Sequence, residues 1–182
     1  MNLYILRHAS AGTRRLNPLL DVKRPLDKEG KQQCLHLAHV LNSLKISFDL
    51  VISSPLKRAL QTAQFVATET GYEAQILLST ALAPEATFPD FQRLLHEVNG
   101  KENILVVGHS PNIQLFLGSL LVPPAVAADS ANIPRFRMRK GAIARVSIVR
   151  GTAMLQSMID PRIVRALYAT STTSSRRKTS RK

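Results

Sequence analysis

Residues 103–111, Asn-Ile-Leu-Val-Val-Gly-His-Ser-Pro, contain the stretch that decides the fold. Residues 103–107 are almost continuously apolar, which is typical of a strand buried on both faces of a parallel sheet. After Gly108-His109, we expect the Ser-Pro pair 110–111 to start a helix, with serine as the N-cap and proline in the first turn. The stretch therefore predicts one strand–loop–helix unit of an α/β domain.

Two other apolar runs end in the same kind of loop. Residues 2–6 are followed by Arg7-His8 and several small residues, and residues 49–53 are followed by the Ser-Pro pair 54–55 and a helical pattern. The other expected elements are a loop over 13–25, a helix capped by Asp27, a short strand over 74–78, a loop over 82–89, a helix stopped by Asn99-Gly100, a loop over 122–134 and an edge hairpin of strands 142–149 and 153–158. Together they predict a three-layer α/β/α sandwich with a mainly parallel sheet.

The composition sets the domain count and the broad class. The chain has 182 residues and 45% hydrophobic residues, which suits one domain over residues 1–160 followed by a disordered basic tail over 169–182. The net charge is +13, so the surface would attract phosphates, nucleic acids, acidic proteins or anionic membranes without choosing among them. A single cysteine, Cys34, excludes a disulfide within the chain and a thiol-rich metal site.

The apolar stretches do not suggest a membrane protein. Residues 113–128 are broken by Pro123-Pro124 and are short for a membrane span, and the N-terminus lacks the pattern of a secretory signal. We therefore expect a cytoplasmic protein. His36 and His39 have a spacing that can hold a metal, but no third ligand is evident, so we expect neither a metal nor a cofactor.

Three loops are expected to meet at one edge of the sheet. In parallel sheets ligands bind beyond the carboxyl ends of the strands, and this rule selects Arg7-His8, the segment 54–58 that ends in Arg58, and His109. Arginine forks match phosphate oxygens, and an imidazole can attack a phosphoryl group to form a covalent intermediate. The pattern therefore predicts a phosphoryl-binding site built from side chains.

Four segments resemble motifs of one family. They are Leu6-Arg7-His8-Ala9, against Arg-His-Gly; residues 54–62, Ser-Pro-Leu-Lys-Arg-Ala-Leu-Gln-Thr, against Ser-Pro-x-x-Arg-Ala-x-Gln-Thr; residues 106–109, Val-Val-Gly-His, against the second-histidine motif; and residues 24–30, Arg-Pro-Leu-Asp-Lys-Glu-Gly, against Arg-Pro-Leu-Thr-x-x-Gly. The combination resembles the histidine phosphatase superfamily, the phosphoglycerate-mutase-like group, over about residues 1–160. In its short length the chain resembles the SixA type of this family, whose members are small phosphohistidine phosphatases.

The resemblance implies roles for individual residues. His8 would be the nucleophile that is transiently phosphorylated, and Arg7, Arg58 and His109 would complete the pocket. Many members of the family take a general acid from the loop after the third strand, which makes Glu85 the candidate here, with Asp90 behind it. The alternative for Glu85 is an exposed loop carboxylate, since the SixA type often lacks this acid. The implied substrate is phosphohistidine on a signalling protein, such as a histidine phosphotransfer domain.

Two other functions remain open. One is a small-molecule phosphomonoesterase of the same family, and the other is a non-catalytic binder of a phosphoprotein or nucleic acid. We expect a monomer whose partner is a phosphorylated protein or small phosphorylated substrate, with no stable nucleic-acid partner and no membrane. Arg135, Arg137 and Arg139 alternate with apolar residues, which fits either a solvated edge strand or a basic face near the pocket mouth that suits an acidic partner.

Overall fold

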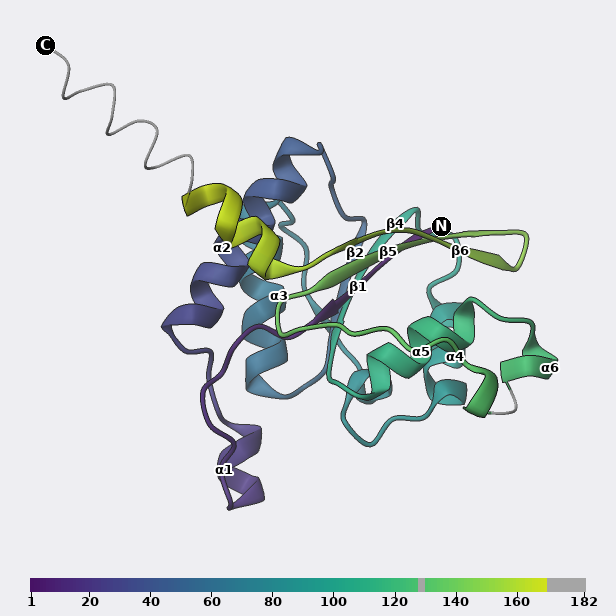
Figure 1. The fold of residues 1–182 in the computed structure, drawn as a ribbon, viewed down its shortest axis with the longest axis horizontal. Helices are drawn as coiled ribbons and strands as arrows, with labels where there is room; N and C mark the ends of the chain where they lie inside the picture. The colour runs from purple at the N-terminus through teal and green to yellow at the C-terminus, as the bar shows by residue number, and fades with distance from the viewer. Residues whose placement is uncertain (128–129, 170–182) are drawn as a thin grey trace, which may run out of the picture.

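A computed structural model describes residues 1–127 and 130–169 and shows a mixed sheet between two layers of helices (Figure 1). The described part contains a six-stranded sheet in the order β3-β2-β4-β1-β5-β6. The strands are β1 Asn2–Arg7, β2 Leu50–Ser53, β3 Leu77–Leu78, β4 Asn103–Gly108, β5 Ile143–Val149 and β6 Thr152–Ile159. Strands β3, β2, β4 and β1 pair in parallel, whereas β5 and β6 form an antiparallel hairpin at the edge. The predicted α/β/α fold with a mainly parallel sheet is confirmed.

The helices cover both faces of the sheet. They are α1 Pro18–Val22, α2 Lys28–Ser43, α3 Lys57–Glu69, α4 Phe88–Glu97, α5 Asn112–Leu120 and α6 Pro124–Ala127, with short helical turns at Thr80–Leu82 and Ser130–Asn132 and a further helix over 161–169. Helices α2 and α3 pack on the sheet face that carries Leu6 and Val107. Helices α4 and α5 pack on the face that carries Ile5 and Val106. Successive strand residues point to opposite faces, so each central strand contributes to both cores.

The helix starts differ from the sequence expectations in two ways. Ser54 and Ser110 are not N-caps, because α3 and α5 begin at Lys57 and Asn112 and have no side-chain cap hydrogen bond. In contrast, the expected loop over 13–25 contains α1, whose N-cap Asn17 accepts a hydrogen bond from the Leu19 N–H at 3.0 Å. Pro18 supports this start, since its ring presets φ for the first turn and no N–H is needed there.

The C-terminal part also departs from expectation. Residues 161–169 form a helix beyond the expected domain end, and Tyr168 stacks on His36 of α2 with ring centroids 4.5 Å apart. Ala169, where we expected the tail to start, is helical, and residues 170–182 lie outside the described residues. Residues 135–139 form an irregular connection, so their assignment to a strand is wrong. The expected loop over 122–134 is interrupted by α6. No described helix has the length and apolarity needed to cross a bilayer.

Candidate active site

The structure brings the predicted site residues together at the carboxyl end of the parallel strands. A cavity of about 820 Å³ is lined by Arg7, His8, Arg58 and His109, with Glu85 also in its wall. The β1–β4 register explains the meeting of the histidines, because Arg7 lies opposite Gly108 and each histidine directly follows its strand. The rings of His8 and His109 have centroids 5.0 Å apart.

His8 is held as a neutral imidazole with one nitrogen free to react. Its Nδ1 lies 2.8 Å from the carbonyl oxygen of Ala9, which accepts the ring N–H and leaves the Nε2 lone pair available. The side chain is buried, and burial lowers its pKa to about 3, helped by the charges of Arg58 and Arg7 and opposed by the Ala9 hydrogen bond. Near neutral pH His8 therefore has the protonation state of a nucleophile.

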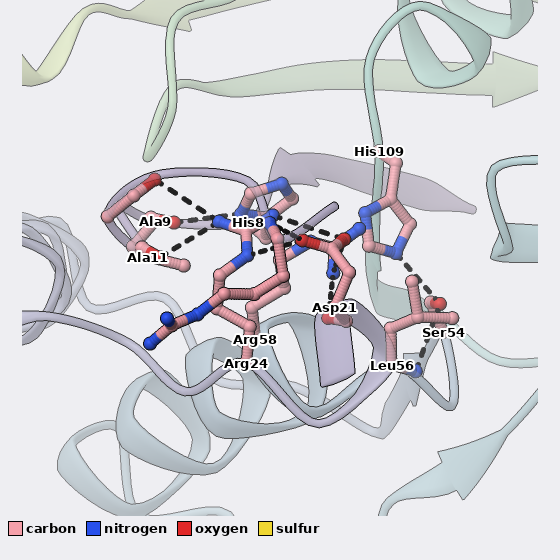
Figure 2. A network of polar contacts seen from close by, with 11 residues as sticks. His8, Ala9, Ala11, Asp21, Arg24, Ser54, Leu56, Arg58 and His109 are labelled. Carbon is pink, nitrogen blue, oxygen red and sulfur yellow. Dashed lines mark hydrogen bonds and ion pairs between the residues drawn. The ribbon is translucent and has the colours of Figure 1, made fainter. Parts of the chain in front are cut away.

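His109 is fixed by a buried serine, and its Nδ1 is left unpaired within the described part of the chain. Its Nε2 lies 2.9 Å from the hydroxyl of Ser54, which is fully buried and accepts the N–H of Leu56 at 3.4 Å (Figure 2). A hydroxyl can accept this N–H and still donate, and in the tautomer in which Ser54 donates to Nε2 the ring proton of His109 lies on Nδ1. Burial, helped by the nearby His8 and arginines, lowers the pKa of His109 to about 2.

Arg7 and Arg58 are anchored by oxygen atoms while part of each guanidinium stays unpaired. Arg7 Nη1 donates to the carbonyl of Met138 at 2.8 Å, and Arg58 Nη1 donates to the carbonyl of Asp21 at 3.1 Å. The Nε atoms of both arginines, like Nδ1 of His109, are buried and lack a hydrogen-bond partner in the described residues. Leaving a buried donor unpaired costs about 1–3 kcal/mol, so these groups suit an anion with several acceptor oxygens.

Asp21 and Arg24, which sequence reasoning did not assign to the site, tie α1 to the cavity. The Asp21 carboxylate accepts from Arg24 Nε at 2.8 Å and from Arg58 Nη1 at 3.3 Å, and it lies between the two guanidinium groups (Figure 2). The Arg24 hydrogen bond and the neighbouring charges hold the pKa of Asp21 at about 2 against the opposing effect of burial. Asp21 is therefore ionised and cannot serve as a general acid at neutral pH. The Asn17-Pro18 pair is the sequence signal that could have revealed α1, and with it Asp21.

Asp27 organises the loop that carries His8. As expected it caps α2, with its Oδ1 accepting from the Gly30 N–H at 2.7 Å. Its Oδ2 accepts from the Ser10 hydroxyl at 2.8 Å and from the Gly12 N–H at 2.7 Å. Gly30 allows the close approach, because a Cβ there would lie 2.0 Å from the carbonyl oxygen of Ser10. One carboxylate thus locks the loop that carries His8 onto a helix start.

Thr62 adds a second clamp from α3. Its hydroxyl accepts the Ala9 N–H at 3.1 Å and donates to the carbonyl of Arg58 at 2.7 Å. The side chain is 1% exposed, so this hydroxyl has no competition from solvent. The loop after β1 and the helix that carries Arg58 therefore hold a fixed relative position.

The two candidate acids differ in placement. Glu85 lines the cavity but is exposed at its rim. Asp90 forms the capping box of α4 with Thr87 and an ion pair with Arg93, so it belongs to the helix start and not to the cavity. Among the described residues, no three His, Cys, Asp or Glu side chains gather in a way that could hold a metal ion.

Comparison with known proteins gives the family. The sequence model of the histidine phosphatase superfamily (branch 1) matches residues 3–83. The chain is 33% identical over 116 residues to an uncharacterized protein of Picosynechococcus sp., over 62% of this chain and 68% of that one. The chain belongs to the histidine phosphatase superfamily. Enzymes of this superfamily are hydrolases.

Solved structures show that the histidine phosphatase fold extends over nearly the whole described chain. The protein histidine phosphatase SixA, complexed with tungstate, matches with a TM-score of 0.77 and 23% identity over 90% of this chain and 99% of that one. The alpha-ribazole phosphatase of Shigella flexneri matches with a TM-score of 0.64 and 20% identity over 88% of this chain and 97% of that one. At these identities the likeness shows a shared fold.

Proposed function

We propose that the chain is a metal-independent phosphatase that removes the phosphoryl group from phosphohistidine in a signalling protein, with His8 as nucleophile. The observation that carries the proposal is the group of three buried, unpaired donors that surround a neutral imidazole: Arg7 Nε, Arg58 Nε and His109 Nδ1. Preorganised donors of this kind stabilise the charge on a phosphoryl group during its transfer.

The reaction takes two displacement steps. In the first, Nε2 of His8 attacks phosphorus, the P–N bond of the substrate breaks, and the departing imidazole nitrogen takes up a proton from solvent. In the second, water attacks the phosphorus of phospho-His8, which releases inorganic phosphate, returns one proton to solvent and leaves His8 neutral. Arg7, Arg58 and His109 donate hydrogen bonds to the phosphoryl oxygens throughout.

Two features support phosphohistidine as the substrate. The structure with the higher TM-score of the two described above is a protein histidine phosphatase that holds tungstate, a tetrahedral oxyanion like phosphate. In addition, Glu85 is exposed at the rim, where it would protonate a leaving group only weakly. Because imidazole leaves readily, a phosphohistidine substrate needs less help from an acid than an alkyl phosphate does.

A second candidate is a small-molecule phosphomonoesterase. It is favoured by the presence of Glu85 in the cavity wall and by the match to an alpha-ribazole phosphatase. In this reading Glu85 turns inward on binding and protonates the alcohol oxygen that leaves.

Parallel assays on both substrate classes test the proposal. Phosphate release is measured from a phosphohistidine-bearing phosphotransfer domain and from a panel of sugar phosphates and nucleotides. We expect higher kcat/KM on the phosphoprotein and an acid-labile phosphoenzyme after rapid quenching. His8→Ala abolishes both, while His96→Ala, an exposed histidine on α4, serves as the matched control. Full activity in His8→Ala would refute His8 as the nucleophile, whereas a wild type that binds but turns over neither substrate class would favour a non-catalytic binder.

Glu85→Gln separates the two candidates. If the substrate is phosphohistidine, the variant retains turnover of the phosphoprotein, because the leaving group needs little protonation. A large loss confined to an alkyl phosphate that the wild type turns over well identifies the metabolite enzyme instead.

A further inference from the structure

A second cavity of about 620 Å³ adjoins the catalytic one and shares Arg7 and Lys140 with it. Its walls come from α2, from the connection before β5 and from the helix over 161–169. The cationic residues that line it are Arg7, Arg137, Arg139, Lys140, Arg162 and Arg165, and we call this cavity the basic groove.

The basic groove keeps an excess of positive charge after its internal ion pairs are counted. Arg139 and Arg162 share one partner, Asp160, at 3.3 Å each, and Arg165 lies 3.8 Å from Glu29. Arg137 and Lys140 form no ion pair within the described residues. An excess of partly exposed cations attracts acidic groups over a distance of about one Debye length, roughly 8–10 Å in physiological salt.

The other unusual feature at the catalytic cavity is an exposed apolar ridge at α1, formed by one leucine just before the helix and two leucines within it. Leu16, Leu19 and Leu20 are 103%, 76% and 57% exposed, and we call them the α1 ridge. Helix α1 has no buried residue and stands out from the helical layers (Figure 1). Leu16 lines the catalytic cavity itself. A cluster of exposed leucines beside an active site is typical of a surface that another protein covers.

We infer that the catalytic cavity lies within a protein-docking surface formed by the basic groove and the α1 ridge. The occupant is a phosphoprotein whose phosphorylated residue is flanked by an acidic patch, which faces the groove, and by apolar side chains, which cover the ridge. The inference rests on the proposed function, because it names the partner of the same site. The chemistry of the partner follows from charge complementarity to the groove and from burial of apolar side chains on the ridge.

A small polyanion fits these observations less well. A ligand with several phosphates would gain from the cations of the groove but would bury nothing on the three leucines of the ridge. Protein interfaces combine both kinds of contact, with apolar anchors and a charged rim that steers association. The two features together therefore favour a folded acidic partner.

A pair of charge reversals tests the groove. Arg137→Glu/Arg165→Glu is compared with Lys101→Glu/Arg150→Glu, which changes the net charge equally at the opposite end of the sheet. With a phosphotransfer domain carrying phosphohistidine as the probe, we expect the groove variant to raise KM by about 10- to 100-fold with kcat little changed. Turnover of phosphoramidate, which is too small to reach Arg137 or Arg165 while bound at His8, stays at the wild-type value in both variants.

The ridge is tested in the same way. Leu19→Ser/Leu20→Ser is compared with Val149→Ser/Met154→Ser, which removes exposed apolar side chains from the edge hairpin. We expect only the α1 variant to raise KM for the phosphorylated domain, by about 5- to 20-fold, since each leucine loses a desolvated contact. A domain with its acidic residues near the histidine changed to glutamine and asparagine should lose its dependence on the groove but keep that on the ridge.

Binding separates failure of this inference from failure of the proposed function. The phosphorylated domain is titrated against His8→Ala protein by calorimetry, with and without the groove and ridge changes. Binding that depends on groove and ridge, without any turnover by the wild type, overturns the proposed function and supports the docking surface. Turnover of the domain that ignores all four substitutions overturns the docking surface alone.

Discussion

Two sets of arginines lie side by side in this molecule, and they are held in opposite ways. Arg58 in the catalytic cavity has a side chain only 8% exposed and donates to a backbone carbonyl, whereas Arg165 in the basic groove is 65% exposed and has a single ion pair at 3.8 Å. A buried, anchored guanidinium keeps its donors aimed at one point, which phosphoryl transfer requires. An exposed guanidinium adapts and is screened by salt, which suits the approach of a partner.

The largest expected effect comes from deleting one arginine of each set. Arg58→Ala should lower kcat/KM about 1000-fold on every phosphorylated substrate, because it removes a preorganised donor from the transition state. Arg137→Ala should leave turnover of phosphoramidate within about twofold, since exposed surface charges act weakly at a distance. Steady-state phosphate release measures both, and circular dichroism checks folding. Equal losses of activity in the two variants would show that the buried and the exposed arginines do not differ in their roles.

A smaller effect is expected at Ser54, which supports His109 from behind. Ser54→Ala removes the hydroxyl that pairs with Nε2, so the ring proton is no longer fixed on Nδ1. A lost buried hydrogen bond of about 1–2 kcal/mol corresponds to roughly a tenfold fall in kcat. Ser54→Thr keeps the hydroxyl and should restore most of the rate. If threonine rescues nothing, the serine acts through packing and not through the hydrogen bond.

The meeting of the site residues could be predicted from sequence because it depends on one general rule. Parallel strands end at the same edge of the sheet, so Arg7-His8 and His109 meet once residues 2–6 and 103–107 are assigned as neighbouring strands. Arg58 follows from its place at the start of the helix after the next strand. These residues required only the strand assignments and no knowledge of side-chain contacts.

The misassigned helix starts show where local patterns stop being informative. Asn17-Pro18 and Asp160-Pro161 mark real helix starts, whereas Ser54-Pro55 and Ser110-Pro111 resemble them and do not. At these two sites the hydroxyl has another partner: that of Ser54 contacts His109, which is distant in sequence, and that of Ser110 donates to Gln114, four residues further on. A cap signal identifies a side chain that can accept a helix N–H, but not whether its hydroxyl forms another hydrogen bond. Because such pairs do not reliably mark helix starts, the Asn17-Pro18 pair did not lead to a prediction of α1, which carries Asp21.

Salt should lower the kcat/KM that depends on the exposed arginines a few-fold and leave the kcat/KM that depends on the buried ones almost unchanged. Raising ionic strength from 50 to 300 mM is expected to lower kcat/KM on an acidic phosphotransfer domain by about fivefold, because the exposed cations of the groove are screened. Phosphoramidate should show almost no change, since its phosphoryl group is bound in the buried cavity. In the Arg137→Glu/Arg165→Glu protein the salt effect should vanish or reverse. A similar salt slope for both substrates would assign the effect to the catalytic cavity.

The smallest expected effect is the response of His8 itself to pH between 8 and 5. A histidine with the ordinary pKa of about 6.5 becomes mostly protonated at pH 5 and would lose its nucleophilic lone pair. Burial and the flanking arginines lower the pKa of His8 to about 3, so its ring should stay neutral across this range. NMR of the His8 ring proton should show a nearly constant chemical shift in the folded protein and a full titration in urea.

The same shift has a consequence for stability whose sign is fixed. Between pH 6.5 and about 3 the unfolded chain binds a proton at residue 8 that the folded chain does not, so the free energy of unfolding falls as the pH drops through this window. His109, with its pKa lowered to about 2, adds to the slope. His8→Gln removes one of the two groups, so urea titrations should show a shallower fall for this variant than for the wild type. An unchanged slope would mean that His8 is protonated in the folded state, and the arginines around it would then face a cation and not a nucleophile.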